Sequence, residues 1–276
     1  MRDTDRRMIE LRHKDGRVLY IAQDAWNLRE AVERAASARV DLSGVQLPDA
    51  DLGGVSLEDA KLVGANLARA NLRRANLEEV DFTGADLTGA RLDGANLERA
   101  DLDRATLVGA SLRGANLEES GLDGADLSRA DLDGVNLEEG DLRNACLEGA
   151  SLRRANLERV LLSHARAKGV VLTGTNLEKS DLQHADLSGA DFSGANLERV
   201  DMRDATLAGA RMVGANIERA DLRRADLSDV DLRESNLERC DVDDATMDGV
   251  RLDSANVSGM RGRPAPPKPG SSGPYR

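Results

Sequence analysis

Two of the three histidines, His164 and His184, lie twenty residues apart, and Asp204 follows at the same spacing. Imidazole nitrogens and carboxylate oxygens are common zinc ligands, so a fold that stacks every twentieth residue would place half of a metal site here. The sequence supplies no compelling third ligand, and chance stacking of two rings on one face is the better interpretation. We therefore expect neither a metal ion nor another cofactor.

A second regular series is acidic, because a glutamate recurs every twenty residues from Glu58 to Glu238. Stacked like charges repel unless a neighbour relieves them. The residue after each glutamate is basic in the C-terminal half but mostly acidic in the N-terminal half. We call the unrelieved part the acidic strip; it comprises Glu58, Asp59, Glu78, Glu79, Glu118, Glu119, Glu138 and Glu139. Two interpretations remain open: a docking surface for a basic partner, and a solvated face produced by repeat duplication.

These spacings belong to a five-residue repeat that runs without interruption from Val40 to Met260. We call its main apolar position the centre: of 44 centres, 35 are Leu and eight are Phe, Met, Ile or Val, and a small residue lies two positions earlier. A period of five would smear apolar residues around a helix and alternate them between the faces of a strand. The chain must therefore turn in every unit, so that all centres point to a common axis.

A longer period indicates how many turns close one circuit. Asn-Leu-Glu recurs every twenty residues from Asn76 to Asn236, with Ile217 once in place of Leu. Four units thus form one coil, and 44 units predict an all-β, four-sided solenoid of about eleven coils. At the spacing of paired strands, about 4.8 Å, the rod would be roughly 53 Å long. The stacked asparagine amides are expected to hydrogen-bond from coil to coil.

Units such as Ala65-Asn66-Leu67-Ala68-Arg69 and Ala85-Asp86-Leu87-Thr88-Gly89 resemble those of the pentapeptide-repeat family, over about four-fifths of the chain. The resemblance implies a right-handed quadrilateral β-helix. It also implies a function, because some members are acidic rods that mimic DNA on DNA gyrase and protect this topoisomerase from poisons. The chain lacks the projecting loops of one gyrase-protecting branch and a C-terminal dimerising helix, so it is more similar to the loop-free members.

The N-terminal segment is expected to cover the open end of the solenoid. The Asp-Gly pair between short alternating segments predicts a hairpin over residues 8–22. Asp24 is the predicted N-cap of a helix over residues 25–38. Hairpin and helix together would form a small α+β cap, in which Trp26 and Tyr20 are expected to pack.

The C-terminal segment after Met260 is rich in proline, glycine and basic residues, which predicts a disordered tail. The last coil would then be uncovered, and two alternatives remain open: an end-to-end homodimer, or a monomer over which the tail folds back loosely. The centres at this end are Val242, Met247, Leu252 and Val257. The predicted domains are therefore a cap over residues 1–39, a β-helix over 40–260 and a tail over 261–276.

The repeat has one local fault, at residues 160–175, where Ala167 replaces a large centre and Leu161 and Val171 take positions that are usually polar. We favour a tolerated defect over an apolar contact patch or a bend. The two cysteines are too far apart in a stacked fold to form a disulfide. Cys240 takes a small inward position and is expected to be inert, whereas Cys146 is expected to be partly exposed.

The charge distribution limits the function classes. The chain has a net charge of −12, made up of −18 in the repeats, +2 in residues 1–39 and +4 in the tail. This argues against direct nucleic-acid binding and favours a basic protein partner. The sequence shows no leader, no membrane span and no phosphate loop, and a filled rod offers no pocket. We therefore expect a cytoplasmic, non-enzymatic protein that binds no membrane.

Two functions remain. DNA gyrase is the best specific partner, although the repeats carry about one net charge per 3 Å, against one per ~1.7 Å in B-DNA. The alternative is a general protein-interaction scaffold with an unknown partner.

Overall fold

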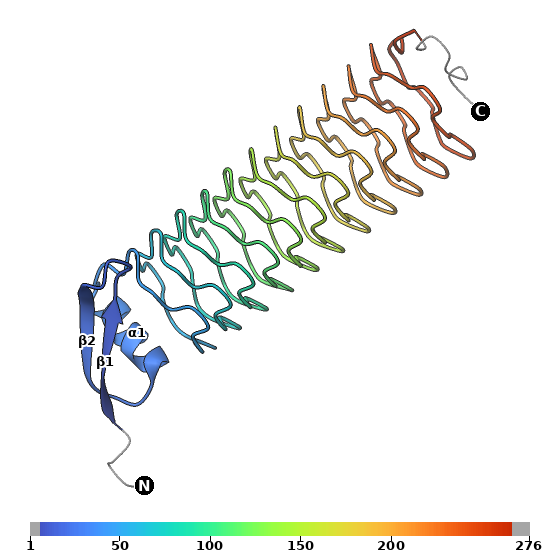
Figure 1. Ribbon diagram of the computed structural model, residues 1–276. Coiled ribbons are helices and arrows are strands. Elements are labelled where there is room, and N and C mark those ends of the chain that lie inside the picture. The colour runs from blue at the N-terminus through green and yellow to red at the C-terminus, as the bar shows by residue number, and fades with distance from the viewer. Residues whose placement is uncertain (1–5, 267–276) are drawn as a thin grey trace.

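The computed structural model describes residues 6–266. After a small N-terminal unit, the chain forms a rod of stacked coils (Figure 1). Parallel β-bridges join residues twenty positions apart, as between Asn76 and Asn96 and between Asp81 and Asp101. The bridges confirm that twenty residues form one coil, while the total of eleven coils stays a prediction.

Each side of a coil ends in a tight turn. In the unit centred on Phe82, Ala85 donates its backbone N–H to the Phe82 carbonyl oxygen at 2.8 Å, and Gly84 between them has a φ of 63°. A type II turn has this positive φ at its third residue. Some units place a charged residue there instead, such as Glu79 with a φ of 54°, which costs about 1–2 kcal/mol. One such turn in every five residues directs each centre to the axis.

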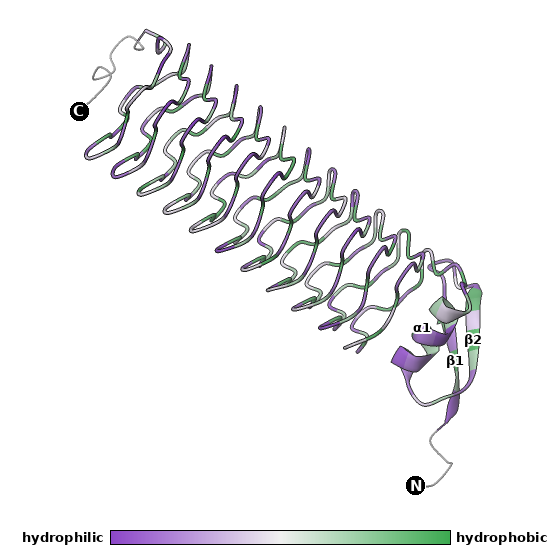
Figure 2. Cartoon of the chain, turned by 180° about the vertical axis from the view of Figure 1, so that it is seen from behind, coloured by the Kyte–Doolittle hydropathy of each residue, from purple (hydrophilic) through white to green (hydrophobic). Residues whose placement is uncertain are grey.

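Two kinds of side chain fill the rod: the large centres and the small residues two positions before them. Leu97 and Phe192 are 0% exposed, and Ala95 is 1% exposed. Figure 2 shows how hydrophobic and hydrophilic residues alternate along the coils. Where a hydroxyl takes the small position, it donates to a nearby carbonyl, as from Ser120 Oγ to Leu117 O at 2.6 Å. Within residues 6–266, no buried side-chain nitrogen or oxygen lacks a hydrogen-bond partner.

The N-terminal unit consists of β1 (Arg7–Arg12), β2 (Val18–Ala25) and α1 (Leu28–Ser37). The strands pair antiparallel across the predicted turn. The predicted N-cap at Asp24 was wrong, because β2 continues through this residue. Asn27 caps α1 instead, and its side chain accepts the Glu30 N–H at 2.9 Å. In the part of the chain that the structure describes, no helix is long and apolar enough to cross a membrane.

The N-terminal unit contacts the first coil through both the hairpin and the helix. His13 forms an antiparallel bridge with Val45, and the Arg29 guanidinium donates to Gly53 O at 3.0 Å. Tyr20 packs against the core, as predicted. The prediction for Trp26 was wrong, because its side chain is 45% exposed, with the Arg6 guanidinium 4.7 Å above the ring.

The C-terminal end is more ordered than predicted up to residue 266. Residues 261–266 continue the stacking: Val242 donates to Arg261 O at 2.9 Å, and Ala265 donates to Ala245 O at 2.8 Å. Such backbone bonds form because a short extended segment fits the open edge, even in a sequence rich in proline. The remainder of the predicted tail, residues 267–276, lies outside the described residues.

Of the four centres predicted at this end, Val242 and Met247 are buried. Leu252 is partly buried and Val257 is 42% exposed. An end-to-end contact would therefore have only Leu252 and Val257 available from this set. The dimer itself, like the division into three domains, stays a prediction.

Candidate protein-interaction surface

The acidic strip lies along one column of turns. The strip consists of pairs of consecutive acidic residues, such as Glu58–Asp59. The second residue of each pair has a positive φ, as in Asp59 at 58° and Glu119 at 56°, and is exposed on the rod surface. Because every coil repeats this turn, the pairs stack in register along the N-terminal half of the rod.

Two arginines divide the acidic strip. Arg99 lies 2.6 Å from Glu78 and 3.1 Å from Glu79, and Arg159 lies 2.9 Å from Glu139. Within residues 6–266, the pairs Glu58–Asp59 and Glu118–Glu119 have no ion-pair partner. The unrelieved charge thus lies in two places: beside the N-terminal unit and near the middle of the rod.

The asparagine column beside the strip forms the predicted amide ladder, which is confirmed. Asn136 Nδ2 donates to Asn116 Oδ1 at 3.1 Å and also to the Glu118 carboxylate at 3.0 Å. Asn76 holds Glu58 in the same way at 3.1 Å. The ladder therefore supports the backbone and also orients the carboxylates of the acidic strip.

A second acidic group, which the sequence analysis missed, occupies the next side of the same coils. We call it the aspartate cluster: Asp81, Asp101, Asp103, Asp123 and Asp141, of which Asp141 forms an ion pair with Arg143. Along the chain, two residues separate it from the glutamate column, and the second of them is small and buried, such as Val80 or Ala100. The twenty-residue spacing of its members was the signal that could have revealed it. The N-terminal half of the rod thus carries acidic groups on two adjoining sides.

Mutual repulsion is visible at the centre of this cluster. Burial, together with the charges of Asp101, Asp123 and Asp141, raises the pKa of Asp103 above its ordinary value of 3.8, although the carboxylate accepts the Asp123 N–H at 2.9 Å. Because the folded-state pKa is raised, ionisation of Asp103 weakens the folded state at neutral pH.

We expect Asp103→Asn to increase the free energy of unfolding at pH 7 by about 0.5 kcal/mol. The substitution removes the negative charge, and the new amide oxygen can still accept the hydrogen bond from the Asp123 N–H. The gain should disappear near pH 3, where the wild-type carboxyl is protonated in both states. Urea unfolding at the two pH values measures this. An equal gain at both would mean that the charge is not the cause.

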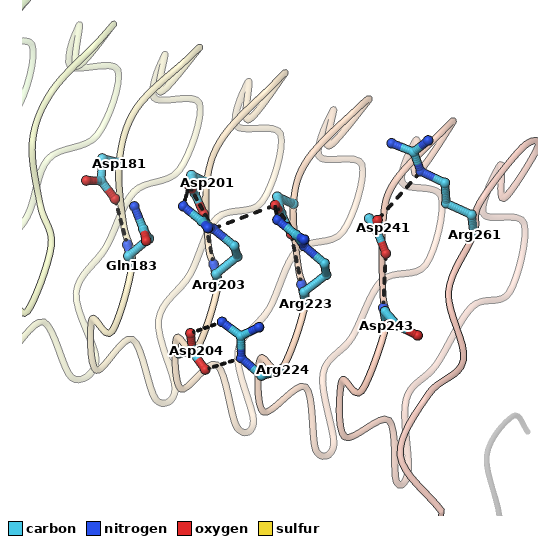
Figure 3. Close-up of polar contacts among 11 residues, drawn as sticks. Asp181, Gln183, Asp201, Arg203, Asp204, Arg223, Arg224, Asp241, Asp243 and Arg261 are labelled. Carbon is cyan, nitrogen blue, oxygen red and sulfur yellow. Dashed lines mark hydrogen bonds and ion pairs between the residues drawn. The ribbon is translucent and has the colours of Figure 1, made fainter.

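On the same side of the coils, more of the aspartates are paired with arginine in the C-terminal half (Figure 3). Arg203 lies 2.7 Å from Asp201, and Arg224 forms two hydrogen bonds to Asp204 at 2.7 and 2.6 Å. The Arg224 contact lowers the pKa of Asp204. The two halves of the rod therefore differ in surface charge although they share one backbone.

The histidine pair stacks as predicted. The ring centroids of His164 and His184 are 4.8 Å apart and the planes differ by 8°. Zinc binds in-plane nitrogen lone pairs at about 2.0–2.1 Å, and two parallel rings direct these lone pairs side by side instead of toward one ion. The Asp204 carboxylate, the third candidate ligand, is already hydrogen-bonded to Arg224. In the described ranges, no three His, Cys, Asp or Glu side chains are placed to hold a metal ion.

Both cysteines are buried. The prediction that Cys146 is partly exposed was wrong, because the residue is 6% exposed and its thiol lies 3.0 Å from Ser128 Oγ. Burial raises the pKa of Cys240 to about 12, and its thiol donates to Ile217 O at 2.8 Å. Reactive cysteines have lowered pKa values, so Cys240 packs and is not a nucleophile.

The repeat fault leaves an apolar cavity of about 10 Å³ in the core beside Ala167. The backbone ladder continues through it, since Ala167 donates to Asp186 O at 2.8 Å. Leu161 is 38% exposed. The fault is therefore a packing defect in the core. The backbone hydrogen-bond ladder is unbroken, and it does not indicate a bend.

We expect Ala167→Leu to increase the free energy of unfolding by about 1–2 kcal/mol, because leucine is the usual residue at this position and would bury more apolar surface where the core is underpacked. Ala85→Leu is the matched control, since Ala85 is 0% exposed in a small position of a unit in the same column, and its coil contributes no residue to the cavity. It should lower stability by about 1–3 kcal/mol through overpacking. Urea unfolding of both variants tests this, and a loss for Ala167→Leu would contradict it.

Comparison with known proteins identifies the repeat. A family profile described as pentapeptide repeats matches eight times, at residues 41–78, 50–89, 81–120, 110–149, 120–159, 150–189, 185–224 and 225–259. Among curated proteins, no relative matches the chain.

Among solved structures, the chain is similar to HetL, a pentapeptide repeat protein involved in heterocyst differentiation regulation from the cyanobacterium Nostoc sp. strain PCC 7120. The identity is 29%, over 85% of this chain and 96% of HetL, with a TM-score of 0.59. The profile and this similarity confirm the right-handed quadrilateral β-helix.

Two further structures match over shorter lengths. QnrB1, a plasmid-mediated fluoroquinolone resistance protein, is 16% identical over 64% of this chain and 91% of its own, with a TM-score of 0.38. Rfr23 from the cyanobacterium Cyanothece 51142 is 36% identical over 43% of this chain and 90% of its own, with a TM-score of 0.32.

Proposed function

The chain belongs to the pentapeptide-repeat family, and we propose that it is a non-enzymatic, cytoplasmic scaffold that binds a basic surface of a protein partner. The observation that carries the proposal is the joint position of the acidic strip and the aspartate cluster on two adjoining sides of the N-terminal half. The C-terminal half has the same backbone but pairs more of its carboxylates with arginine or lysine. Negative charge is thus concentrated in the N-terminal half, where the asparagine ladder holds the glutamates of the acidic strip in register.

DNA gyrase is the specific partner that we propose to test first. Its DNA-binding surface must be basic along a line, because it accepts a duplex with closely spaced phosphates. Stacked turns present carboxylates along a line at strand spacing, about 4.8 Å. Arg99 and Arg159 interrupt this line, so the unpaired Glu118–Glu119 and the neighbouring aspartate cluster would supply most of the attraction.

The test is DNA supercoiling by purified gyrase, with and without a quinolone, across a titration of this protein. We expect inhibition of supercoiling, or protection from the quinolone, at micromolar protein. Reversal of charge at Glu78, Glu79, Glu118 and Glu119 to lysine should abolish the effect, because it replaces attraction by repulsion.

The matched control reverses four glutamates of the same column outside the acidic strip: Glu178, Glu198, Glu218 and Glu238. These carboxylates already lie beside basic side chains, as Glu178 does 2.7 Å from Lys179, so this variant should keep its activity. The effect should also weaken steeply with salt. An effect that survives reversal of the acidic strip would exclude this surface, and no effect of the wild type on gyrase would leave the general scaffold with another basic partner.

A further inference from the structure

A cleft of about 750 Å³ separates the end of α1 from one corner of the first coil. Ser37 and Arg39 lie on the side of the helix, and Ser56, Glu58, Asp59 and Lys61 lie on the side of the coil. One more coil below this corner would need an extended segment at about residues 37–40. The cleft forms because α1 continues to Ser37, so no extended segment lies there. It is therefore a concave place at the end of a rod whose coils are otherwise stacked.

The backbone of this corner lacks the partners that it has in later coils. One coil further, the Asn76 carbonyl accepts from Leu57 at 2.8 Å and the Glu78 carbonyl accepts from Asp59 at 3.0 Å. The equivalent carbonyls of the first coil belong to Ser56 and Glu58. Their donors would be residues 37 and 39, but Arg39 donates to Ala36 O at 2.7 Å to end the helix.

Within residues 6–266, three backbone groups on this edge therefore have no hydrogen-bond partner: Ser56 C=O, Glu58 C=O and Lys61 N–H. The N-terminal unit provides a hydrogen-bond partner for one other backbone group on this edge: Ser56 N–H donates to the Glu33 carboxylate at 3.3 Å. Two acceptors and one donor in the spacing of a coil side form a template for one more extended segment.

The charges around this edge indicate what such a segment should carry. Glu58 and Asp59 are the first pair of the acidic strip, and neither has an ion-pair partner within the described part of the chain. The C-terminal end of α1 adds partial negative charge to the cleft. The wall also carries two cations, Arg39 and Lys61, and a third carboxylate, Asp41, so the carboxylates outnumber the cations by three to two.

We propose that this cleft binds an extended, basic segment of a partner protein, which adds one side of a coil to the open edge. The backbone of the segment would donate to Ser56 O and Glu58 O and accept from Lys61 N–H, and a lysine or arginine side chain would lie against Glu58 and Asp59. The inference deepens the proposed scaffold function by naming a site and a partner class. It does not require that the partner is gyrase.

The probe is a labelled capped pentapeptide, Val-Lys-Val-Lys-Val, with binding followed by fluorescence anisotropy and by amide chemical shifts. We expect saturable binding that shifts Arg39 and Ser56–Lys61. The double variant Glu58→Gln/Asp59→Asn should weaken it by about tenfold. A peptide methylated on its backbone nitrogens keeps the charge but loses the donors, and should not bind.

The matched control is Glu178→Gln/Glu198→Gln, which removes the same charge from the same column outside the acidic strip and should leave binding of the peptide unchanged. Absence of binding, equal binding of the methylated peptide, or equal weakening by the control would each overturn the proposal. These outcomes are separate from the gyrase test, because the gyrase variants leave Glu58 and Asp59 intact.

Discussion

Phe192→Ala should lower the free energy of unfolding by about 3–5 kcal/mol, the largest effect that we expect from a single substitution in the rod. The side chain is 0% exposed and lies among centres of the adjoining coils. Coils above and below cannot move together to close the gap, since backbone bonds at every side hold their spacing, as between Phe192 N–H and Arg211 O at 2.7 Å. Urea unfolding followed by circular dichroism measures the change.

Phe192→Leu is the control for this prediction. Leucine is the residue at most centres, so the neighbouring coils already accept its shape, and the exchange should cost less than about 1.5 kcal/mol. A similar loss for both variants would mean that the aromatic ring has a role beyond filling the core.

Gly44→Ala should lower stability by about 2–3 kcal/mol and loosen the hairpin from the first coil. Gly44 has a φ of 70°, and an added Cβ would overlap the ring of His13. It also accepts the Lys14 N–H at 3.0 Å, next to the bridge between His13 and Val45. The substitution thus adds a steric clash to the usual cost of positive φ.

Hydrogen exchange of the amides in β1 and β2 should reveal the loosened contact, together with urea unfolding. Gly64→Ala is the matched control, because Gly64 takes the same position one coil later, with a φ of 60° and no atom within 4 Å of an added Cβ. It should show only the backbone cost, about 1–2 kcal/mol, and normal exchange in the hairpin. Faster exchange in both variants would contradict the role of His13.

The fold could be predicted because a single period controls it. A centre every five residues and Asn-Leu-Glu every twenty leave little choice of architecture, and the bridges between residues such as Asn76 and Asn96 follow that spacing. The errors fall where no repeat operates. Asp24 and Asn27 are both good helix caps by residue type, and only the length of the pairing with β1 decides that Asn27 is used.

The candidate surface was predictable in position but not in strength. The spacing placed the acidic strip correctly on one column, yet it could not show that Arg99 would reach back to both Glu78 and Glu79. Long side chains have many rotamers, so the sequence alone does not decide which of several carboxylates an arginine contacts. The missing partners at Ser56 and Glu58 were equally hidden, because they depend on where α1 ends.

The coil-to-coil bonds also have a consequence for how the chain reaches this structure. Each one connects residues about twenty apart, as from Asn96 N–H to Ala75 O, so no step requires the closure of a long loop. A nascent chain could complete the N-terminal unit first and then lay down one coil at a time on the last finished edge, as fast as residues leave the ribosome. Folding by such growth would advance from one end, and the newest edge would be the only unfinished surface at any moment.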